Sequence, residues 1–172
     1  RLQPPSVRIT DRAGRLLYES FPEKGGRHQV LPFEQIQKHI IQATIATEDA
    51  TFYQIAGVDP VRIAAAALRN TQEGEVTFGA STITMQVARN FFLSSEKTLS
   101  RKVYEALLAF KIENNLSKDE ILEIYINQIY LGQRAYGFAA ASQIYFAKPL
   151  RDVNAAEAAM LAGLPKAPSS YN

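Results

Sequence analysis

The sequence has no cysteine, only two histidines, and no stretch that approaches the roughly 20 consecutive apolar residues of a membrane-spanning helix. The absence of cysteine excludes disulfide bonds and thiolate metal sites, and His28 and His39 do not have metal-ligand spacing. The sequence also lacks a large excess of either positive or negative charge. The 19 basic and 17 acidic side chains leave a formal net charge of +2, which does not favour a nucleic-acid-binding protein. The chain opens with Arg1 rather than methionine, so we expect a fragment from which a membrane-anchoring or targeting segment has been removed.

What the sequence does contain is the composition of a globular domain. Hydrophobic residues make up 47% and charged residues 21% of the 172 residues, enough for one domain with a hydrophobic core. Near the N-terminus, apolar and polar residues alternate on both sides of a turn-like DRAG segment. This alternation predicts a short β-hairpin with Val7 and Ile9 facing Leu16 and Tyr18.

The remainder of the chain is predicted to be helical, because apolar residues recur at helical spacing from about residue 33. Capping boxes at Ser117 with Glu120 and at Asn154 with Glu157 indicate two helix starts. The predicted helices cover about residues 33–48, 59–74, 82–93, 98–116, 117–132, 135–147 and 154–163. We therefore expect a hairpin region over residues 1–32 and one mainly α domain over residues 33–172.

Two adjacent carboxylates, Glu48 and Asp49, lie in an otherwise apolar and neutral segment. Neighbouring side chains on a helix diverge by roughly 100°, so at most one of the two enters a given pocket. Phe52 and nearby aliphatic residues form an apolar wall of the kind that favours general-base chemistry. The alternative is a pair of solvated carboxylates at a helix end, which is the commoner fate of such a pair taken alone.

A further carboxylate, Glu105, shares a helix face with two cations, since Arg101 precedes it by four residues and Lys102 by three. A surface ion-pair cluster is the simpler interpretation. Because Leu107 and Phe110 leave little of this helix polar, the functional alternative is a charged face that lines a cleft.

The segment GASTITMQ combines glycine with hydroxyl and amide side chains at the expected start of a helix. Backbone N–H groups at such a start bind phosphate or sugar oxygens, whereas N-capping alone accounts for only one of these residues. The segment brings together Gly79, Ser81, Thr82, Thr84 and Gln86, of which Gly79, Ser81, Thr82 and Gln86 are the candidate binding residues. Six basic side chains would form a cationic wall for a pyrophosphate if even half of them converge, and scattered surface charge if they do not: Arg89, Lys97, Arg101, Lys102, Arg134 and Lys148.

Phe91, Phe92 and Leu93 form an apolar cluster that is flanked by basic residues. Aromatic and basic side chains occur together at membrane–water interfaces. Packing in the core and contact with a membrane are the two interpretations that this composition leaves open.

The segments EDATFYQIAG, GASTITMQ, RKVYE, KDEILEIYINQIYLG and RAYGFAAASQIYFAK follow one another along the chain. In sequence and spacing they resemble the successive motifs of the peptidoglycan glycosyltransferase domains of class A penicillin-binding proteins, most of all the 1A type, and of monofunctional glycosyltransferases. The match covers about residues 33–172, including the terminal LPKAPSSYN. It implies a lysozyme-like helical fold of two lobes that polymerises lipid II at the outer, periplasmic face of the bacterial cytoplasmic membrane.

The resemblance also implies roles for individual residues. Glu48 matches the general base, and Glu105 matches the glutamate that helps to activate or stabilise the lipid pyrophosphate. A divalent cation, Mg²⁺ or Mn²⁺, is a candidate helper at Glu105, and no organic cofactor is expected. The other matched motif positions are Asp49, Phe52, Ser81, Thr82, Gln86, Arg101, Lys102 and Asn127. The chain departs from the family pattern at Ile55, where histidine is common, and at Met85, where glutamine is usual.

The residues favour glycosyl transfer over hydrolysis on chemical grounds as well. A glycosidase protonates a poor sugar-alkoxide leaving group, whereas transfer from a polyprenyl pyrophosphate needs cations more than a proton. The alternatives are a lysozyme-like peptidoglycan hydrolase and a non-catalytic module that binds lipid II or glycan. The expected partners are lipid II, the growing glycan strand and the membrane surface, with a transpeptidase domain as a candidate C-terminal neighbour and no nucleic acid.

Overall fold

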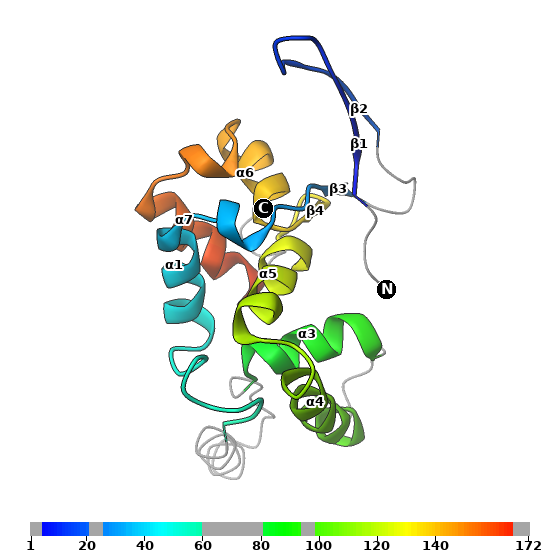
Figure 1. Cartoon of the computed structure of the whole chain (residues 1–172), viewed down its shortest axis with the longest axis vertical. Coiled ribbons are helices and arrows are strands. Elements are labelled where there is room, and N and C mark those ends of the chain that lie inside the picture. The colour runs from blue at the N-terminus through cyan, green and yellow to red at the C-terminus, as the bar shows by residue number, and fades with distance from the viewer. Residues whose placement is uncertain (1–4, 21–25, 60–80, 94–98, 167–172) are drawn as a thin grey trace.

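The structure, a computed structural model, describes residues 5–20, 26–59, 81–93 and 99–166 (Figure 1). Several sequence predictions lie outside the described residues. They are most of the predicted helix over residues 59–74, the two predicted binding residues Gly79 and Lys97, and the C-terminal segment from Ala167 onward.

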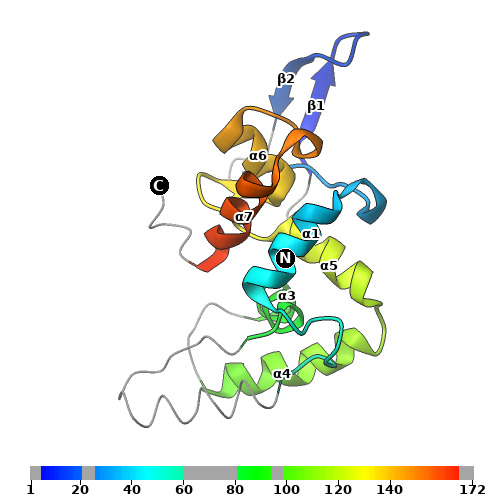
Figure 2. The same cartoon turned by 90° about the vertical axis from the view of Figure 1, so that its left-hand side faces the viewer.

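The described residues form six α-helices, which confirms the prediction of a mainly α domain. The helices are α1 (Lys38–Glu48), α3 (Ile83–Phe92), α4 (Leu99–Glu113), α5 (Lys118–Gln128), α6 (Phe138–Phe146) and α7 (Ala155–Gly163). Short 3-10 turns are η1 (Phe33–Gln35), η2 (Leu150–Asp152) and η3 (Leu164–Lys166), and the strands are β1 (Val7–Thr10), β2 (Leu16–Ser20), β3 (Arg27–His28) and β4 (Ala135–Tyr136). Figures 1 and 2 show α3 and α4 together at one end of the helical domain, α6 at the other, and α1, α5 and α7 between them, with α7 beside α1. None of these helices is both long and apolar enough to cross a bilayer.

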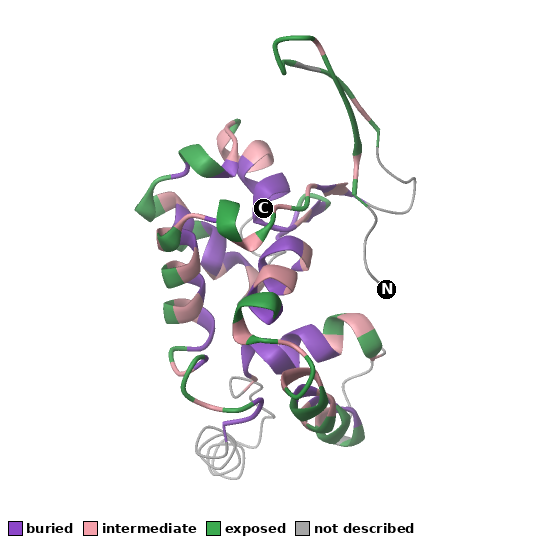
Figure 3. Ribbon diagram, viewed as in Figure 1, coloured by how far each residue is buried: buried purple, intermediate pink, exposed green. Residues whose placement is uncertain are grey.

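The main core lies where α1, α3, α5, α6 and α7 meet, and Figure 3 shows the buried residues concentrated there. Each helix contributes fully buried aliphatic or aromatic side chains, such as Ile40, Leu122, Phe138 and Leu161. Removing such side chains from water is the main source of stability of a helical domain of this size.

A second, smaller cluster joins α3 and α4 and consists of Val58, Met85 and Ala109. Helix α3 serves both clusters, because Ile83 and Val87 face the main core while Met85 faces the small one. This division into a larger and a smaller cluster agrees with the predicted two-lobed fold.

Both predicted capping boxes are present. Ser117 Oγ accepts a hydrogen bond from the backbone N–H of Glu120, and Glu120 Oε2 accepts one from the backbone N–H of Ser117 at 2.7 Å. Asn154 and Glu157 make the same reciprocal pair at the start of α7. These pairs satisfy N–H groups that a helix start otherwise leaves without a partner.

Three predicted helix boundaries are clearly wrong. The helix predicted from residue 135 begins at Phe138, because Ala135 and Tyr136 form strand β4 and Gly137, with φ +81°, turns the chain into the helix. The first helix begins at Lys38 rather than near residue 33, because η1 precedes it and Ile36 adopts an extended backbone conformation that places its side chain in the core. Helix α5 ends at Gln128 rather than near residue 132, since Ile129 is extended and Gly132, with φ +83°, turns the chain back toward β4.

The predicted hairpin is present, with antiparallel strands β1 and β2 that project away from the helices (Figure 1). Ile9 pairs with Tyr18 as predicted. Val7 pairs with Ser20 rather than with a predicted partner, because an antiparallel register that places Ile9 opposite Tyr18 places Val7 opposite residue 20. Leu16 pairs with Thr10, since the register shifts between Ile9 and Thr10. A parallel pair between β3 and β4, absent from the sequence prediction, lies beside the base of the hairpin.

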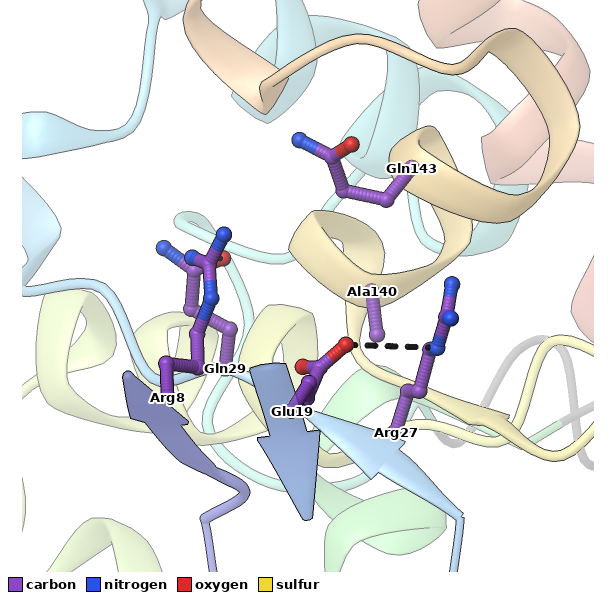
Figure 4. A pocket seen from close by; sticks show the side chains of 6 residues that line it. All are labelled: Arg8, Glu19, Arg27, Gln29, Ala140 and Gln143. Carbon is purple, nitrogen blue, oxygen red and sulfur yellow. Dashed lines mark hydrogen bonds and ion pairs between the residues drawn. The ribbon is translucent and has the colours of Figure 1, made fainter. Parts of the chain in front are cut away.

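A small polar pocket of about 40 Å³ lies between the base of the hairpin and α6 (Figure 4). It contains an ion pair of Glu19 with Arg27 at 3.3 Å, and Arg8 donates a hydrogen bond to Gln29 at 2.9 Å. None of the residues that line it belongs to the predicted site. The pocket therefore marks the place where the hairpin attaches to the helical domain.

Candidate active site

Glu48 is the last residue of α1 and lies against α3. Its side chain is only 8% exposed, and its Oε2 accepts a hydrogen bond of 2.8 Å from Gln86 Nε2. Gln86 is equally buried and lies in the first turn of α3. The structure thus brings together a carboxylate of the first motif and an amide of the second.

Asp49 points to a different partner, as expected for the neighbour of Glu48. It follows α1 directly, and its Oδ2 accepts a hydrogen bond of 3.2 Å from the backbone N–H of Ile83, the first residue of α3. A carboxylate at a helix N-terminus is stabilised by the unpaired N–H groups and by the helix dipole. Asp49 therefore holds the end of α1 against the start of α3.

The residues just before α3 fix its start in space. Thr82 caps the helix by accepting a hydrogen bond from the backbone N–H of Met85, and its hydroxyl donates to the carbonyl oxygen of Gly57 at 2.6 Å. Ser81 Oγ accepts a hydrogen bond from Lys102 Nζ on α4. Both second-motif hydroxyl groups thus connect α3 to neighbouring segments.

Glu105 is fully buried on the inner face of α4 between two cations. Lys102 Nζ lies 2.8 Å from its Oε2 and Arg101 Nε lies 3.1 Å from its Oε1, which confirms that the three residues share one face of the helix. Removing a carboxylate from water costs several kcal/mol unless partners compensate it. The two cations provide that compensation here, and they concentrate positive charge beside Ser81.

A buried phenol that the sequence analysis did not identify lies close to this site. Tyr125 on α5 is 1% exposed, and burial raises its pKa well above the usual range. The charge of Glu48 raises this pKa further, and the charge of Arg89 acts in the opposite direction. Both charges therefore act on the Tyr125 hydroxyl, which stays protonated. The residue lies within the motif EIYIN, but its apolar neighbours favour a core position.

Other predicted site residues lie elsewhere. Phe52 is 1% exposed and packs in the main core. Asn127 uses its side chain on backbone groups, accepting from Leu31 N–H and donating to the carbonyl oxygens of Leu31 and Glu123. Arg134 lies in the turn before β4, where its carbonyl oxygen accepts from the backbone N–H of Arg27. The Asn127 side chain therefore holds backbone segments together, and Lys148, which follows α6, forms an ion pair of 2.7 Å with Glu157 on α7.

The outer face of α4 is apolar and exposed. Val103, Tyr104, Leu107 and Phe110 are each between 47% and 60% exposed. In the predicted apolar cluster, Phe92 is 63% exposed, whereas Phe91 packs against the main core. Phe91 therefore fits the core interpretation, whereas contact of Phe92 with a membrane stays a prediction.

No group of three or more histidine, cysteine or acidic side chains among the described residues is arranged to hold a metal ion. Both carboxylate oxygens of Glu105 already face cations, and that positive charge opposes a resident divalent ion at the same carboxylate. The described residues around Glu105 therefore do not fit a protein-bound metal ion.

Comparison with known proteins identifies the family. A family model described as transglycosylase matches residues 14–172. The penicillin-binding protein 1A of Neisseria lactamica is 67% identical over 130 residues, which cover 76% of this chain and 16% of that protein. The penicillin-binding protein 1A of Neisseria flavescens is 58% identical over 146 residues, which cover 85% of this chain and 18% of that protein.

The penicillin-binding protein 1A of Vibrio cholerae is 49% identical over 172 residues, which cover 100% of this chain and 20% of that protein. The chain thus spans a fifth or less of the length of these relatives. The resemblance seen in the five ordered motifs is confirmed. Because the family model covers nearly the whole chain, the chain belongs to the transglycosylase family.

Proposed function

We propose that this domain is a peptidoglycan glycosyltransferase that polymerises lipid II into β-1,4-linked glycan strands. The observation that carries the proposal is the pairing of two buried glutamates with different partners. Glu48 accepts a hydrogen bond from an amide, and Glu105 lies between two cations. The family match and the names of the relatives support the same activity.

In the proposed reaction, the 4-hydroxyl oxygen of the acceptor sugar attacks the anomeric carbon of the donor. The bond between this carbon and the pyrophosphate oxygen breaks, and the polyprenyl pyrophosphate leaves with the electron pair. Glu48 takes the hydroxyl proton as general base, with the Gln86 amide fixing one of its oxygens. Attack from the opposite side inverts the α-linked donor to a β linkage.

The cations beside Glu105 suit the leaving group. A departing pyrophosphate develops negative charge, and fixed cations near that charge stabilise the transition state. Lys102 and Arg101 supply two positive charges next to the start of α3. A lysozyme-like hydrolase would instead need a carboxylic acid to protonate a sugar oxygen. No step of the proposed mechanism passes through a metal ion, and a requirement for Mg²⁺ or Mn²⁺ stays a prediction for a chelation experiment.

The proposed substrate has a lipid tail, so we propose that the domain works at the periplasmic face of the bacterial cytoplasmic membrane. The exposed apolar side chains of Phe92 and of the outer face of α4 support this location, because they would otherwise contact water. The relatives are about five times as long as this chain, which is compatible with the C-terminal transpeptidase domain that the resemblance implies.

Incubation of the protein with labelled lipid II in detergent tests the proposal. The wild-type domain should release polyprenyl pyrophosphate and lengthen glycan. Glu48→Gln preserves the size of the side chain but removes the proton acceptor, and should lose about 10²–10⁴-fold in rate. Shortening of preformed strands without lengthening would show a hydrolase, and binding without turnover would show a non-catalytic module. Parallel reactions with chelator, followed by Mg²⁺ or Mn²⁺, decide whether a cation is needed.

A further inference from the structure

The segment of residues 49–58, here called the 49–58 loop, directly follows Glu48 and is held at both ends (Figure 2). Asp49 binds the start of α3, and the carbonyl oxygen of Gly57 accepts from Thr82. Gly57 has φ +62°, and a Cβ atom there would lie 3.2 Å from the backbone of Ala109 and Phe110. The end of the loop therefore lies directly against α4.

Lys118, the first residue of α5, holds the middle of this loop. Its Nζ donates to the carbonyl oxygen of Ile55 at 2.7 Å and lies 4.6 Å from the centre of the Phe52 ring. The same ammonium group forms an ion pair of 2.6 Å with Glu113, the last residue of α4. Glu113 in turn accepts from the Thr84 hydroxyl of α3 at 2.5 Å. We call Lys118, Glu113 and Thr84 the Lys118 clamp.

The three residues of the clamp are well shielded from water. The side chain of Lys118 is 23% exposed, that of Glu113 is 9% exposed, and Thr84 is fully buried. A second, more exposed contact joins the same elements, since the Tyr53 hydroxyl donates to Asp119 at 2.7 Å. Partial burial and this hydrogen bond raise the pKa of Tyr53 to about 12, so the phenol remains a donor throughout the working pH range.

The clamp joins α3 and α4, which carry Gln86 and Glu105, to the loop that directly follows α1. Glu48 immediately precedes the loop, and Gln86 lies two residues after Thr84 on α3. Glu105 lies on α4 eight residues before Glu113, a separation of about 12 Å along the helix axis. We propose that Lys118 is a positioning residue, which sets the end of α1 relative to α3 and α4 and thereby aligns Glu48 with the charged face that holds Glu105.

This role also explains how the chain tolerates Ile55 where the family pattern often has histidine. The interaction that fixes the loop at this position uses the carbonyl oxygen of residue 55, which every amino acid provides. A polar side chain is therefore not needed to hold the loop. The inference rests on the proposed function, because it assigns Lys118 a part in that same reaction.

The test compares Lys118→Met, which keeps the aliphatic stem over Phe52 but removes the ammonium group, with Lys148→Met as matched control. The Lys148 ammonium group forms an ion pair of 2.7 Å with Glu157, which lies on α7 away from the loop. The length of this pair and the exposure of its lysine side chain are similar to those of the Lys118–Glu113 pair. Both proteins are measured for lipid II polymerisation, for melting temperature and for hydrogen exchange at the loop amides of Phe52 and Ile55, which donate hydrogen bonds in the structure.

We expect Lys118→Met to lower kcat by about 10–100-fold with little change in KM, since misplacement of a catalytic group by about 1 Å has an effect of this size. The loop amides should exchange faster, Lys118→Arg should restore most of the rate, and Lys148→Met should change neither rate nor loop exchange. Glu113→Gln, an independent variant, should weaken the same clamp and show a smaller loss.

The inference is overturned if Lys118→Met polymerises lipid II at the rate of Lys148→Met, or if its rate falls while loop exchange stays unchanged. If the wild-type domain forms no polymer, the proposed function fails and Lys118 has no part in that reaction. Loop exchange then shows only whether the clamp orders the 49–58 loop.

Discussion

Replacing Lys102 by methionine tests whether the cations beside Glu105 act on the leaving group or only stabilise the fold. Methionine is similar in length to lysine but carries no charge. In the structure, Lys102 Nζ contacts Glu105 at 2.8 Å and donates to Ser81, and its side chain is 22% exposed. The substitution removes both contacts and leaves Arg101 as the remaining ion-pair partner of the buried carboxylate.

The two possible roles differ in the size of the expected effect. A hydrogen bond to a charged group contributes about 1.5–3 kcal/mol to stability, and partial exposure of Lys102 favours the lower end of that range. For a domain of this length such a loss lowers the melting temperature by roughly 3–6 °C, which leaves the protein folded at room temperature. Loss of a donor that stabilises developing charge in the transition state costs about 2.7–4 kcal/mol, or a factor of about 10²–10³ in kcat.

The assay is initial-rate release of polyprenyl pyrophosphate from labelled lipid II, with circular dichroism and melting temperature measured on the same samples. Lys148→Met is the control, because it removes an ion pair of similar length between Lys148, which follows α6, and Glu157 on α7. We expect Lys102→Met to lose at least 10²-fold in kcat and the control to keep its rate. If Lys102→Met retains near wild-type turnover and only its melting temperature falls, the cations have no part in pyrophosphate departure.

Three further predictions follow from the environment of single residues. Phe92→Ser should weaken binding to anionic vesicles without lowering the melting temperature, whereas Phe91→Ser should lower the melting temperature, because only Phe91 packs against the main core. Asn127→Ala should lower the free energy of unfolding by about 1–3 kcal/mol in a denaturant titration, because it leaves backbone groups before α1 without their partners. A hydrogen bond from Lys148 lowers the pKa of Glu157, so its stabilising contribution is present above the unfolded-state pKa and lost as the pH falls through the lower folded-state value. The melting temperature should therefore fall between about pH 6 and pH 3, and less steeply in Lys148→Met.

Features encoded by residues close together in the chain could be predicted from the sequence. The capping boxes at Ser117 and Asn154 need only four consecutive residues each, and both are present. The pairing of Glu105 with Arg101 and Lys102 follows from helical spacing and is also present. The parallel pair of β3 and β4 joins segments more than a hundred residues apart, and two-residue strands leave no periodic signal to detect.

The contacts of the site itself depend on tertiary structure. The hydrogen bond between Gln86 and Glu48 joins two helices, and nothing in either segment indicates the partner. Asn127 has the residue type of a binding side chain, but the fold uses it to hold the backbone near Leu31. Tyr125 shows the opposite case, since its apolar neighbours favour a core position although its hydroxyl lies where the charges of Glu48 and Arg89 act on it.

Helix α4 connects these observations, because its polarity is reversed relative to an ordinary surface helix. Its apolar spacing is typical of a helix that buries Val103, Leu107 and Phe110, but the structure exposes these side chains and buries Glu105 instead. In water this orientation is energetically unfavourable on both faces, because burying a carboxylate costs free energy and so does exposing a large apolar side chain. Both costs become smaller if a lipid phase covers the outer face and an anionic pyrophosphate approaches the inner one. A substrate with a lipid tail and a pyrophosphate brings these two surroundings together, so the reversed polarity of α4 supports the proposed substrate on grounds independent of the sequence motifs.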